Sequence, residues 1–162
     1  MTGAAVTVRP FSDADLDGVI AVLRDLQTSE RLLFSRMSAP EAMGADYIHA
    51  IRKEAEDAGG NLLVAEVDGK IAGYCTLLTR CDSADELDED HYEFAYVGDL
   101  GVLASERSKG IGARLMEECE QRARAAGIKW LRLSVLATNA RARKFYAAKG
   151  FNEHLIRLEK PL

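Results

Sequence analysis

The sequence predicts a single α/β domain spanning residues 1–162, with a mixed, twisted β-sheet and helices on both of its faces. Strand-like and helix-like hydrophobic patterns follow one another in the order βααβββαβαβ, which is typical of an α/β domain. The length suits one ordinary domain, and neither an internal repeat nor a low-complexity linker divides it. Asp68-Gly69 is a strong hairpin signal, so the early strands are expected to be antiparallel. The late strands are separated by helices and are expected to include parallel neighbours.

Each element follows from apolar spacing and from the residues that begin or end it. Ser12 and Asp15 have the spacing of a capping box at the start of the first helix. Gly59-Gly60, Gly127 and Gly150 are expected to end three of the helices. In chain order, the expected elements are a strand at 6–9, helices at 13–27 and 41–57, strands at 61–67, 70–79 and 94–102, a helix at 110–126, a strand at 130–136, a helix at 139–149 and a strand at 151–158.

The composition sets several classes of protein aside. Hydrophobic residues make up 48% and charged residues 29%, as in ordinary globular proteins. No run of eighteen apolar residues predicts a membrane helix, and the N-terminus does not resemble a secretory signal. Three cysteines without CxxC spacing favour a reducing compartment, so we expect a cytoplasmic protein in which Cys119 belongs to the core. The three histidines are far apart, and no metal site is expected.

The net charge of −5 conceals two oppositely charged regions. Seven acidic residues and no basic ones lie between Asp82 and Glu93, whereas residues 105–149 carry eleven bases and four acids. A pI of 5.3 and the lack of a compact basic cluster argue against a nucleic-acid partner. The basic half therefore favours a small phosphorylated ligand. The acidic segment favours either a cationic substrate or simple solubility, and the sequence leaves both open.

The segment with the clearest chemistry lies between a predicted strand and a predicted helix. Gly110 and Gly112 remove side chains at the helix start, where unpaired N–H groups and the positive end of the helix dipole can bind phosphate. Arg107 and Lys109 are expected to add positive charge there. A Walker loop is absent, and Leu115 stands where the dinucleotide fingerprint needs its third glycine.

The pattern Arg107-x-x-Gly110-x-Gly112 resembles the acetyl-CoA-binding signature of the GNAT superfamily of N-acetyltransferases. Two further segments resemble the family as well. Val8-Arg9-Pro10 is similar to its first strand, and residues 139–151 are similar to its N-x-x-A-x-x-x-Y-x-x-x-G-F segment. The resemblance covers nearly the whole chain, and it implies a GNAT-like fold whose strands splay at the cofactor site.

The resemblance also implies which residues hold acetyl-CoA. The loop and helix start would bind the pyrophosphate, and the free strand edge before them would pair with the pantetheine amides. Asn139 would contact the pantetheine, a role compatible with that of a helix N-cap. The implied cofactor-binding set is Leu100, Gly101, Val102, Arg107, Ser108, Lys109, Gly110, Ile111, Gly112, Ala113 and Asn139.

The family mechanism is direct transfer of the acetyl group to an amine. By analogy, Tyr146 is the general acid that protonates the departing thiolate, since a phenol has a pKa of about 10. Relatives often carry a Glu base four residues before the Val of the signature strand, but Gly98 occupies that position here. Asp99, Glu93 and His91, in that order, are the remaining candidates for the base, and the assignment stays open.

The sequence therefore predicts an acetyl-CoA-dependent N-acetyltransferase acting on a primary amine of a small or peptide acceptor. The alternative is a CoA-binding sensor on the same fold, which the loss of the Glu at Gly98 would fit. Neither a nucleic acid nor a membrane is expected as a partner. A homodimer is expected by analogy with relatives, with residues 151–162 as its edge.

Overall fold

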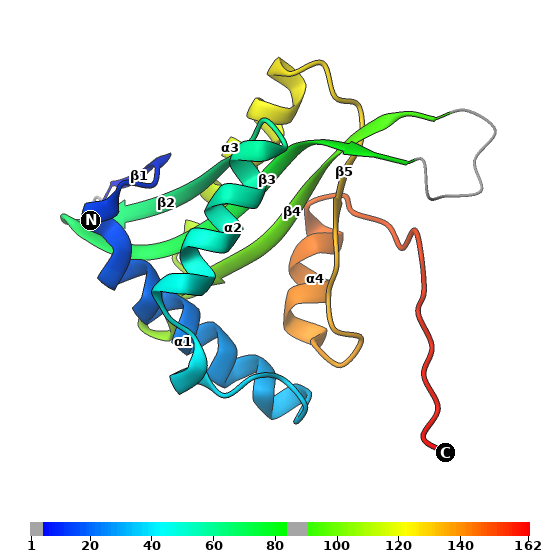
Figure 1. Cartoon of the computed structure of the whole chain (residues 1–162), viewed down its shortest axis with the longest axis horizontal. Coiled ribbons are helices and arrows are strands. Elements are labelled where there is room, and N and C mark those ends of the chain that lie inside the picture. The colour runs from blue at the N-terminus through cyan, green and yellow to red at the C-terminus, as the bar shows by residue number, and fades with distance from the viewer. Residues whose placement is uncertain (1–4, 84–90) are drawn as a thin grey trace.

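The computed structural model describes residues 5–83 and 91–162. Five strands form one sheet in the order β1-β2-β3-β4-β5, antiparallel except for the parallel pair β4 and β5 (Figure 1). This confirms the predicted mixed sheet. The strands are β1 (Val6–Pro10), β2 (Asn61–Val67), β3 (Lys70–Asp82), β4 (Glu93–Val102) and β5 (Leu131–Leu133), and the α-helices are α1 (Leu16–Leu33), α2 (Ala45–Asp57), α3 (Ile111–Ala125) and α4 (Ala140–Ala148).

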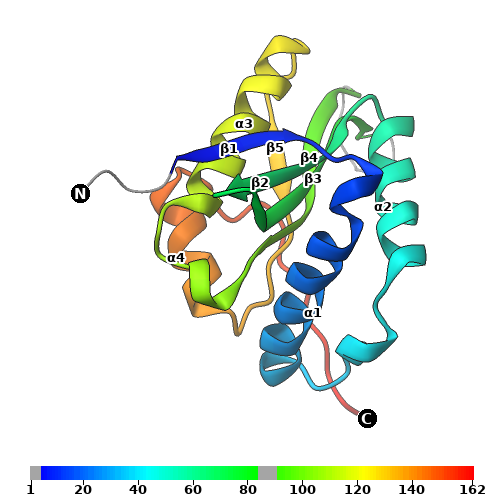
Figure 2. The ribbon, with the colours of Figure 1, turned by 90° about the vertical axis from the view of Figure 1, so that its left-hand side faces the viewer.

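Helices cover both faces of the sheet, as the sequence predicts. In Figure 2, α1 and α2 lie on one side of the strands, and α3 and α4 lie on the other. The alternation of β2 shows the two faces: Leu62 and Val64 pack with α1 and α2, whereas Leu63 and Ala65 pack with α3. Because both faces of the sheet are covered, the middle strands are apolar on both sides.

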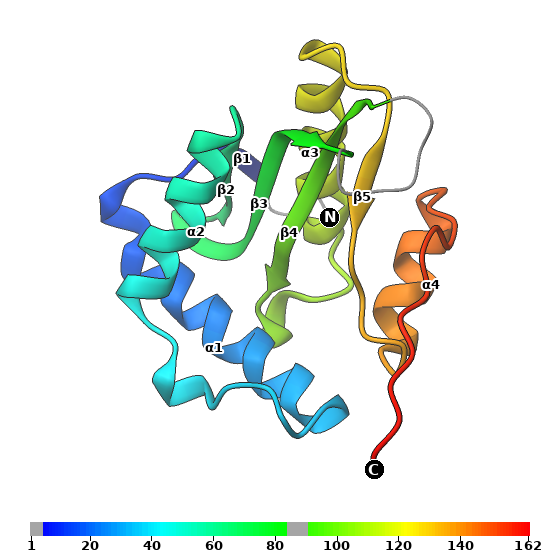
Figure 3. The same ribbon diagram turned by 45° about the vertical axis from the view of Figure 1, so that its right-hand side comes forward.

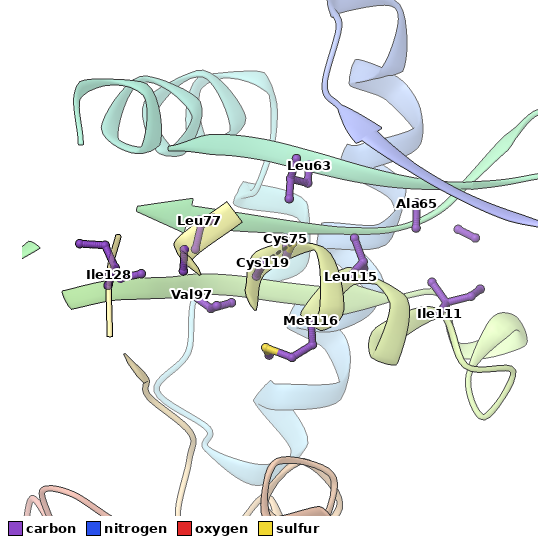
Figure 4. Packing of buried hydrophobic residues seen from close by; sticks show 13 residues of the cluster. Leu63, Ala65, Cys75, Leu77, Val97, Ile111, Leu115, Met116, Cys119 and Ile128 are labelled. Atoms are coloured by element: carbon purple, nitrogen blue, oxygen red, sulfur yellow. Dashed lines mark hydrogen bonds between the residues drawn. The ribbon is translucent and has the colours of Figure 1, made fainter. Parts of the chain in front are cut away.

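The larger apolar cluster lies between α3 and the sheet (Figure 4). Leu115, Met116 and Cys119 of α3 are completely buried in it. Cys119 faces Cys75 of β3 with 3.4 Å between the sulfur atoms, and both are free thiols. Cys119 is thus a core residue, as its helical spacing predicts.

The first helix begins where predicted but ends later. Asp15, in a short 3-10 turn before α1, accepts hydrogen bonds from the backbone N–H and the hydroxyl of Ser12. It also accepts two from Arg9 of β1, at 2.7 and 2.8 Å. The helix continues to Leu33, six residues beyond the predicted end, and this last part carries the side chain of Glu30 towards the sheet.

The pairing of β4 changes along its length, and this change shapes the site. Against β3 the register shifts between Cys75 and Leu77, so that Gly98 and Asp99 together lie opposite Thr76. Such an extra residue is a β-bulge, which bends the strand and redirects its side chains. Against β5, only residues 95–97 are paired, and Figure 3 shows α4 beyond β5 on the side away from α1 and α2.

The predicted final strand at residues 151–158 is wrong in this structure. Residues 151–162 form an extended segment that runs away from the sheet (Figure 1) and pairs with no described strand. Leu155, Ile156 and Leu158 are 82%, 67% and 87% exposed. The alternation that predicts a strand is present, but a strand needs a neighbour to satisfy its backbone groups, and this segment has none among the described residues.

Candidate active site

The bulge in β4 places Asp99 on the sheet face that α1 and α2 cover. Its backbone N–H donates to Thr76 Oγ1 at 2.8 Å, which fixes the bulged residue against β3. Tyr47 of α2 and Tyr74 of β3 both donate to the same carboxylate oxygen, Oδ2, at 3.0 Å each. Among the described residues none donates to Oδ1, so one oxygen of Asp99 is positioned while the other is left for a substrate.

Burial and the two phenol hydrogen bonds shift the pKa of the Asp99 carboxyl in opposite directions. Burial raises the pKa of its carboxyl above the ordinary value, while the hydrogen bonds from Tyr47 and Tyr74 lower it. Burial has the larger effect, so the net pKa is raised. Asp99 is therefore a better proton acceptor than an exposed aspartate while remaining held in one orientation.

The structure also explains why glycine precedes Asp99. A Cβ atom at Gly98 would lie 2.6 Å from Thr76 Oγ1, the same hydroxyl that anchors the bulge. A glutamate at this position would displace that anchor. The departure from the family pattern is therefore coupled to the bulge, which presents Asp99 one residue later.

Tyr146 belongs to the opposite face of the sheet, the one that α3 and α4 cover. It lies on α4, packs edge-on against Phe145 and Phe151, and its hydroxyl has no hydrogen-bond partner among the described residues. Burial, followed by the negative charge of Glu30, raises its pKa to about 12. The phenol therefore stays protonated at neutral pH, as a general acid must.

Glu30 is a further ionisable residue that interacts with Asp99 and Tyr146, and the sequence analysis did not identify it. Burial and the charge of Asp99 raise the pKa of its carboxyl, and its charge in turn raises the pKa of Tyr146. Glu30 thus lies within electrostatic reach of both groups. Asp99, Glu30 and Tyr146 come from three separate elements, β4, α1 and α4, and Glu30 is the link between the other two.

The cofactor side of the site is made of backbone. Beyond its pairing with β5 at residues 95–97, the edge of β4 that faces β5 is paired with no described strand. Its free backbone groups can accept an extended ligand as an added strand. The segment includes Leu100, Gly101 and Val102, which the sequence assigns to cofactor binding.

The start of α3 supplies a second set of backbone groups. Gly110 caps the helix with a φ of 85°, and Ser108 has a φ of 64°, so the loop turns sharply just before the helix. The N–H groups of Ile111, Gly112 and Ala113 are in the first helical turn and lack partners within the helix. Together with the helix dipole, such N–H groups can bind an anion.

The basic side chains of this loop do not gather as predicted. Arg107 turns towards α1, where it donates to Ser29 Oγ at 3.0 Å and to the backbone oxygen of Val102 at 3.0 Å. Lys109 is exposed and pairs with Glu106 at 3.1 Å. Arg107 therefore fastens the end of β4 to α1, and its own backbone N–H donates to the backbone oxygen of Ala104 at 3.4 Å.

Asn139 is the N-cap of α4, with its side-chain oxygen accepting from the N–H of Ala142 at 3.0 Å. Its amide nitrogen donates to none of the described residues, which leaves it free for a ligand. Both roles that the sequence allows are thus compatible with the geometry.

Two of the predicted candidates for the base, Glu93 and His91, do not lie near Asp99. Glu93 begins β4, at the opposite end from Val102, and pairs with Arg80 at 3.0 Å. His91 precedes it and is exposed. Five residues of the acidic segment lie outside the described residues: Asp85, Glu86, Asp88, Glu89 and Asp90.

The described residues contain neither a candidate metal centre nor a membrane-spanning helix. No three His, Cys, Asp or Glu side chains among them are grouped so that they could hold a metal ion. None of the helices in residues 5–83 and 91–162 is both long enough and apolar enough to cross a membrane.

Comparison with known proteins shows the family to which the chain belongs. The family described as "Acetyltransferase (GNAT) family" matches residues 22–151. The chain is 28% identical to an uncharacterized N-acetyltransferase of Lactobacillus delbrueckii subsp. lactis, over 96% of this chain and 90% of that one.

Solved structures share the fold. One is a transcriptional regulator from Bacillus halodurans C-125, with a TM-score of 0.75, 21% identity and coverage of 98% of this chain and 100% of that one. Another is an aminoglycoside acetyltransferase from an uncultured soil metagenomic sample, with a TM-score of 0.64, 18% identity and coverage of 97% and 96%. With the family match over most of its length, the chain belongs to the GNAT family of acetyltransferases.

Proposed function

We propose that the protein transfers an acetyl group from acetyl-CoA directly to a primary amine of a small or peptide acceptor, with Asp99 as the base and Tyr146 as the acid. Both groups lie within electrostatic reach of the same carboxylate, that of Glu30, and this shared neighbour is the observation that carries the proposal. Family membership supports acetyl transfer in general. The choice of acceptor rests on the residues alone.

The residues present suit acetyl-CoA. A Cβ atom at Gly112 would meet Phe145, Leu100 and Val102 no closer than 3.7 Å, so packing within the protein does not require glycine there. The missing side chain instead leaves open the approach to the N–H groups at the helix start. These groups would hold the pyrophosphate, and the free edge of β4 would hold the pantetheine arm.

On the acceptor side, the proton has a defined route. Acetyl-CoA supplies the thioester whose carbonyl carbon the amine attacks, and the C–S bond breaks as the C–N bond forms. Oδ1 of Asp99 accepts the proton that the amine must lose, while Tyr47 and Tyr74 hold the carboxylate through Oδ2. Tyr146 donates its proton to the departing thiolate and recovers one from water.

Calorimetric titration with acetyl-CoA and with dephospho-CoA, followed by a thiol-release assay over an amine library on the same sample, tests this function. Micromolar binding with CoA release by a primary amine is the expected result. Binding without release by any amine would instead favour a CoA sensor. An absence of binding would contradict the assignment of the loop at residues 107–113.

A homodimer built on residues 151–162 is part of the proposal. Leu155, Ile156 and Leu158 are largely exposed, and β5 is the last strand of the described sheet, so its outer edge is open. A second copy of the chain could provide a neighbouring strand for residues 151–158 and for the outer edge of β5. Light scattering should give twice the chain mass, and Leu155→Glu with Leu158→Glu should give a monomer. A monomeric native protein would contradict it.

The cytoplasmic location and the absence of a nucleic-acid partner stay predictions of the sequence. Retention on DNA or RNA at physiological salt, falling steeply as salt is raised, would contradict the second of them.

A further inference from the structure

The inference concerns Glu30 and rests on the proposed function. On α1, Leu26 faces Gly101: a Cβ atom there would lie 3.4 Å from Leu26 Cδ2 and 3.2 Å from Tyr74 Cε1. Glu30 follows Leu26 by four residues and so lies on the same side of the helix. Asp99 precedes Gly101 by two residues and so lies on the same side of the strand. The two carboxylates therefore face the same space beside Tyr74.

The charge of Glu30 is not compensated by a neighbouring base. Among the described residues, no Lys, Arg or His forms an ion pair with either Glu30 or Asp99. The arginines around the second half of α1 are committed to other partners. Arg24 donates to the backbone oxygen of Met43, Arg31 donates to that of Met37, and Arg107 bonds Ser29 and Val102.

Glu30 also has no structural partner that would explain a carboxylate here. None of the described residues donates a hydrogen bond to its side chain, whereas Asp25, five residues earlier on the same helix, accepts from the N–H of Ala104. Glu30 is half-buried, and burial together with the repulsion of Asp99 raises its pKa. Two facing carboxylates of this kind favour a cation between or beside them.

We infer that Glu30 is a specificity-determining residue: its carboxylate binds a second ammonium group of the acceptor, so that the preferred substrates are diamines. The reacting amine is placed at Oδ1 of Asp99, beside Tyr146. The other end of the same molecule, which stays protonated, is placed at Glu30. A monoamine leaves Glu30 without a partner and gains nothing from it.

Two probes that differ only in the second amine test this. We compare 1,4-diaminobutane with butylamine in the thiol-release assay, using the native protein, Glu30→Gln and Asp17→Asn. Asp17 is an exposed acid in the first turn of the same helix, so its variant removes an equal charge away from the site. The native protein should prefer the diamine by about ten-fold or more in kcat/KM. Glu30→Gln should lower kcat/KM for the diamine about ten-fold more than for butylamine, which abolishes the preference, and Asp17→Asn should keep it.

Equal values for the two amines in the native protein would overturn the inference, as would an equal loss for both amines in Glu30→Gln. If neither amine is acetylated, calorimetric titration of the CoA complex with each amine decides. Diamine binding about ten-fold tighter than butylamine binding, and dependent on Glu30, supports the inference, and equal binding overturns it. Failure of the proposed function is separate, because it would appear as lost acetyl-CoA binding, or as no turnover with any amine.

Discussion

The proposed cofactor side and the proposed acceptor side of this site are built from different parts of the chain. The cofactor side consists of backbone: an open strand edge and the N–H groups at the start of α3. The acceptor side consists of the side chains of Asp99, Glu30, Tyr47, Tyr74 and Tyr146, which come from five elements. Backbone binds a cosubstrate whose chemistry is constant, whereas side chains can vary with the acceptor. The two sides should therefore fail separately.

Damage confined to the cofactor side should have the largest effect on binding. Gly110→Val places a β-branched residue at a φ of 85°, a conformation that such residues rarely adopt, and the loop must rearrange. We expect acetyl-CoA affinity to fall at least about ten-fold. Calorimetric titration measures this, and far-UV circular dichroism checks the fold. Normal affinity in a folded variant would remove the helix start from the binding site.

Tyr146→Phe should damage turnover alone. It removes the hydroxyl that protonates the thiolate but keeps the ring that packs against Phe145 and Phe151. We expect kcat to fall about ten-fold or more, with acetyl-CoA affinity nearly unchanged. Steady-state kinetics and titration on one preparation provide both values. An unchanged kcat would exclude Tyr146 as the acid.

A smaller change should appear in the pH profile. Tyr47→Phe removes one of the two donors that lower the pKa of Asp99, so that pKa should rise. Because the base must be ionised, the acid limb of kcat/KM should move to higher pH. Tyr96→Phe is the matched control, since Tyr96 donates to Ser134 instead. A limb that does not move in Tyr47→Phe would show that another group titrates there.

The smallest effect on the site, with a clear effect on stability, is expected at Asp15. Its pKa is lowered to about 2, chiefly by Arg9, so its contribution is present above the unfolded pKa of about 4 and is lost as pH falls towards 2. Asp15→Asn should lower the free energy of unfolding at pH 7 by about 2 kcal/mol, and this difference should shrink in acid.

Asp13→Asn is the matched control, because Asp13 is 84% exposed and, within the described part of the chain, forms an ion pair with Arg52 alone. Urea unfolding of both variants at pH 7 and at pH 3 provides the comparison. Equal stabilities of the two variants at pH 7 would contradict the role given to Asp15.

The same contrast decides what the sequence could predict. The backbone-built side was predictable, because Gly110 and Gly112 mark the helix start directly in the sequence. The place of Tyr146 on the helix that Asn139 caps was predictable from their spacing, and its catalytic role stays a prediction. Glu30, Tyr47 and Tyr74 were not, because each lies in an ordinary amphipathic element and acquires its role only when α1, α2 and β3 meet at Asp99.

Two predictions from the sequence, a final strand and the position of the Arg107 side chain, are wrong for related reasons. Residues 151–158 have strand-like alternation, but local pattern does not provide a neighbouring strand. Arg107 lies next to the glycine loop in sequence, yet the free carbonyl of Val102 and the hydroxyl of Ser29 draw its side chain towards α1. The absence of a final strand and the position of Arg107 both depend on contacts with residues distant in sequence. The bulge at Gly98 cannot be predicted from the sequence for the same reason, because it forms only when β3 and β4 pair.

Asp99→Asn tests the separation of the two sides most directly. It keeps the shape of the side chain and both phenol contacts within reach, but it removes the proton acceptor. The measurement is acetyl-CoA affinity and amine-dependent thiol release on the same sample. We predict an affinity within about two-fold of the native value and a kcat at least about 100-fold lower. Unchanged turnover, or loss of both properties together, would contradict the division between a backbone-built cofactor side and a side-chain-built acceptor side.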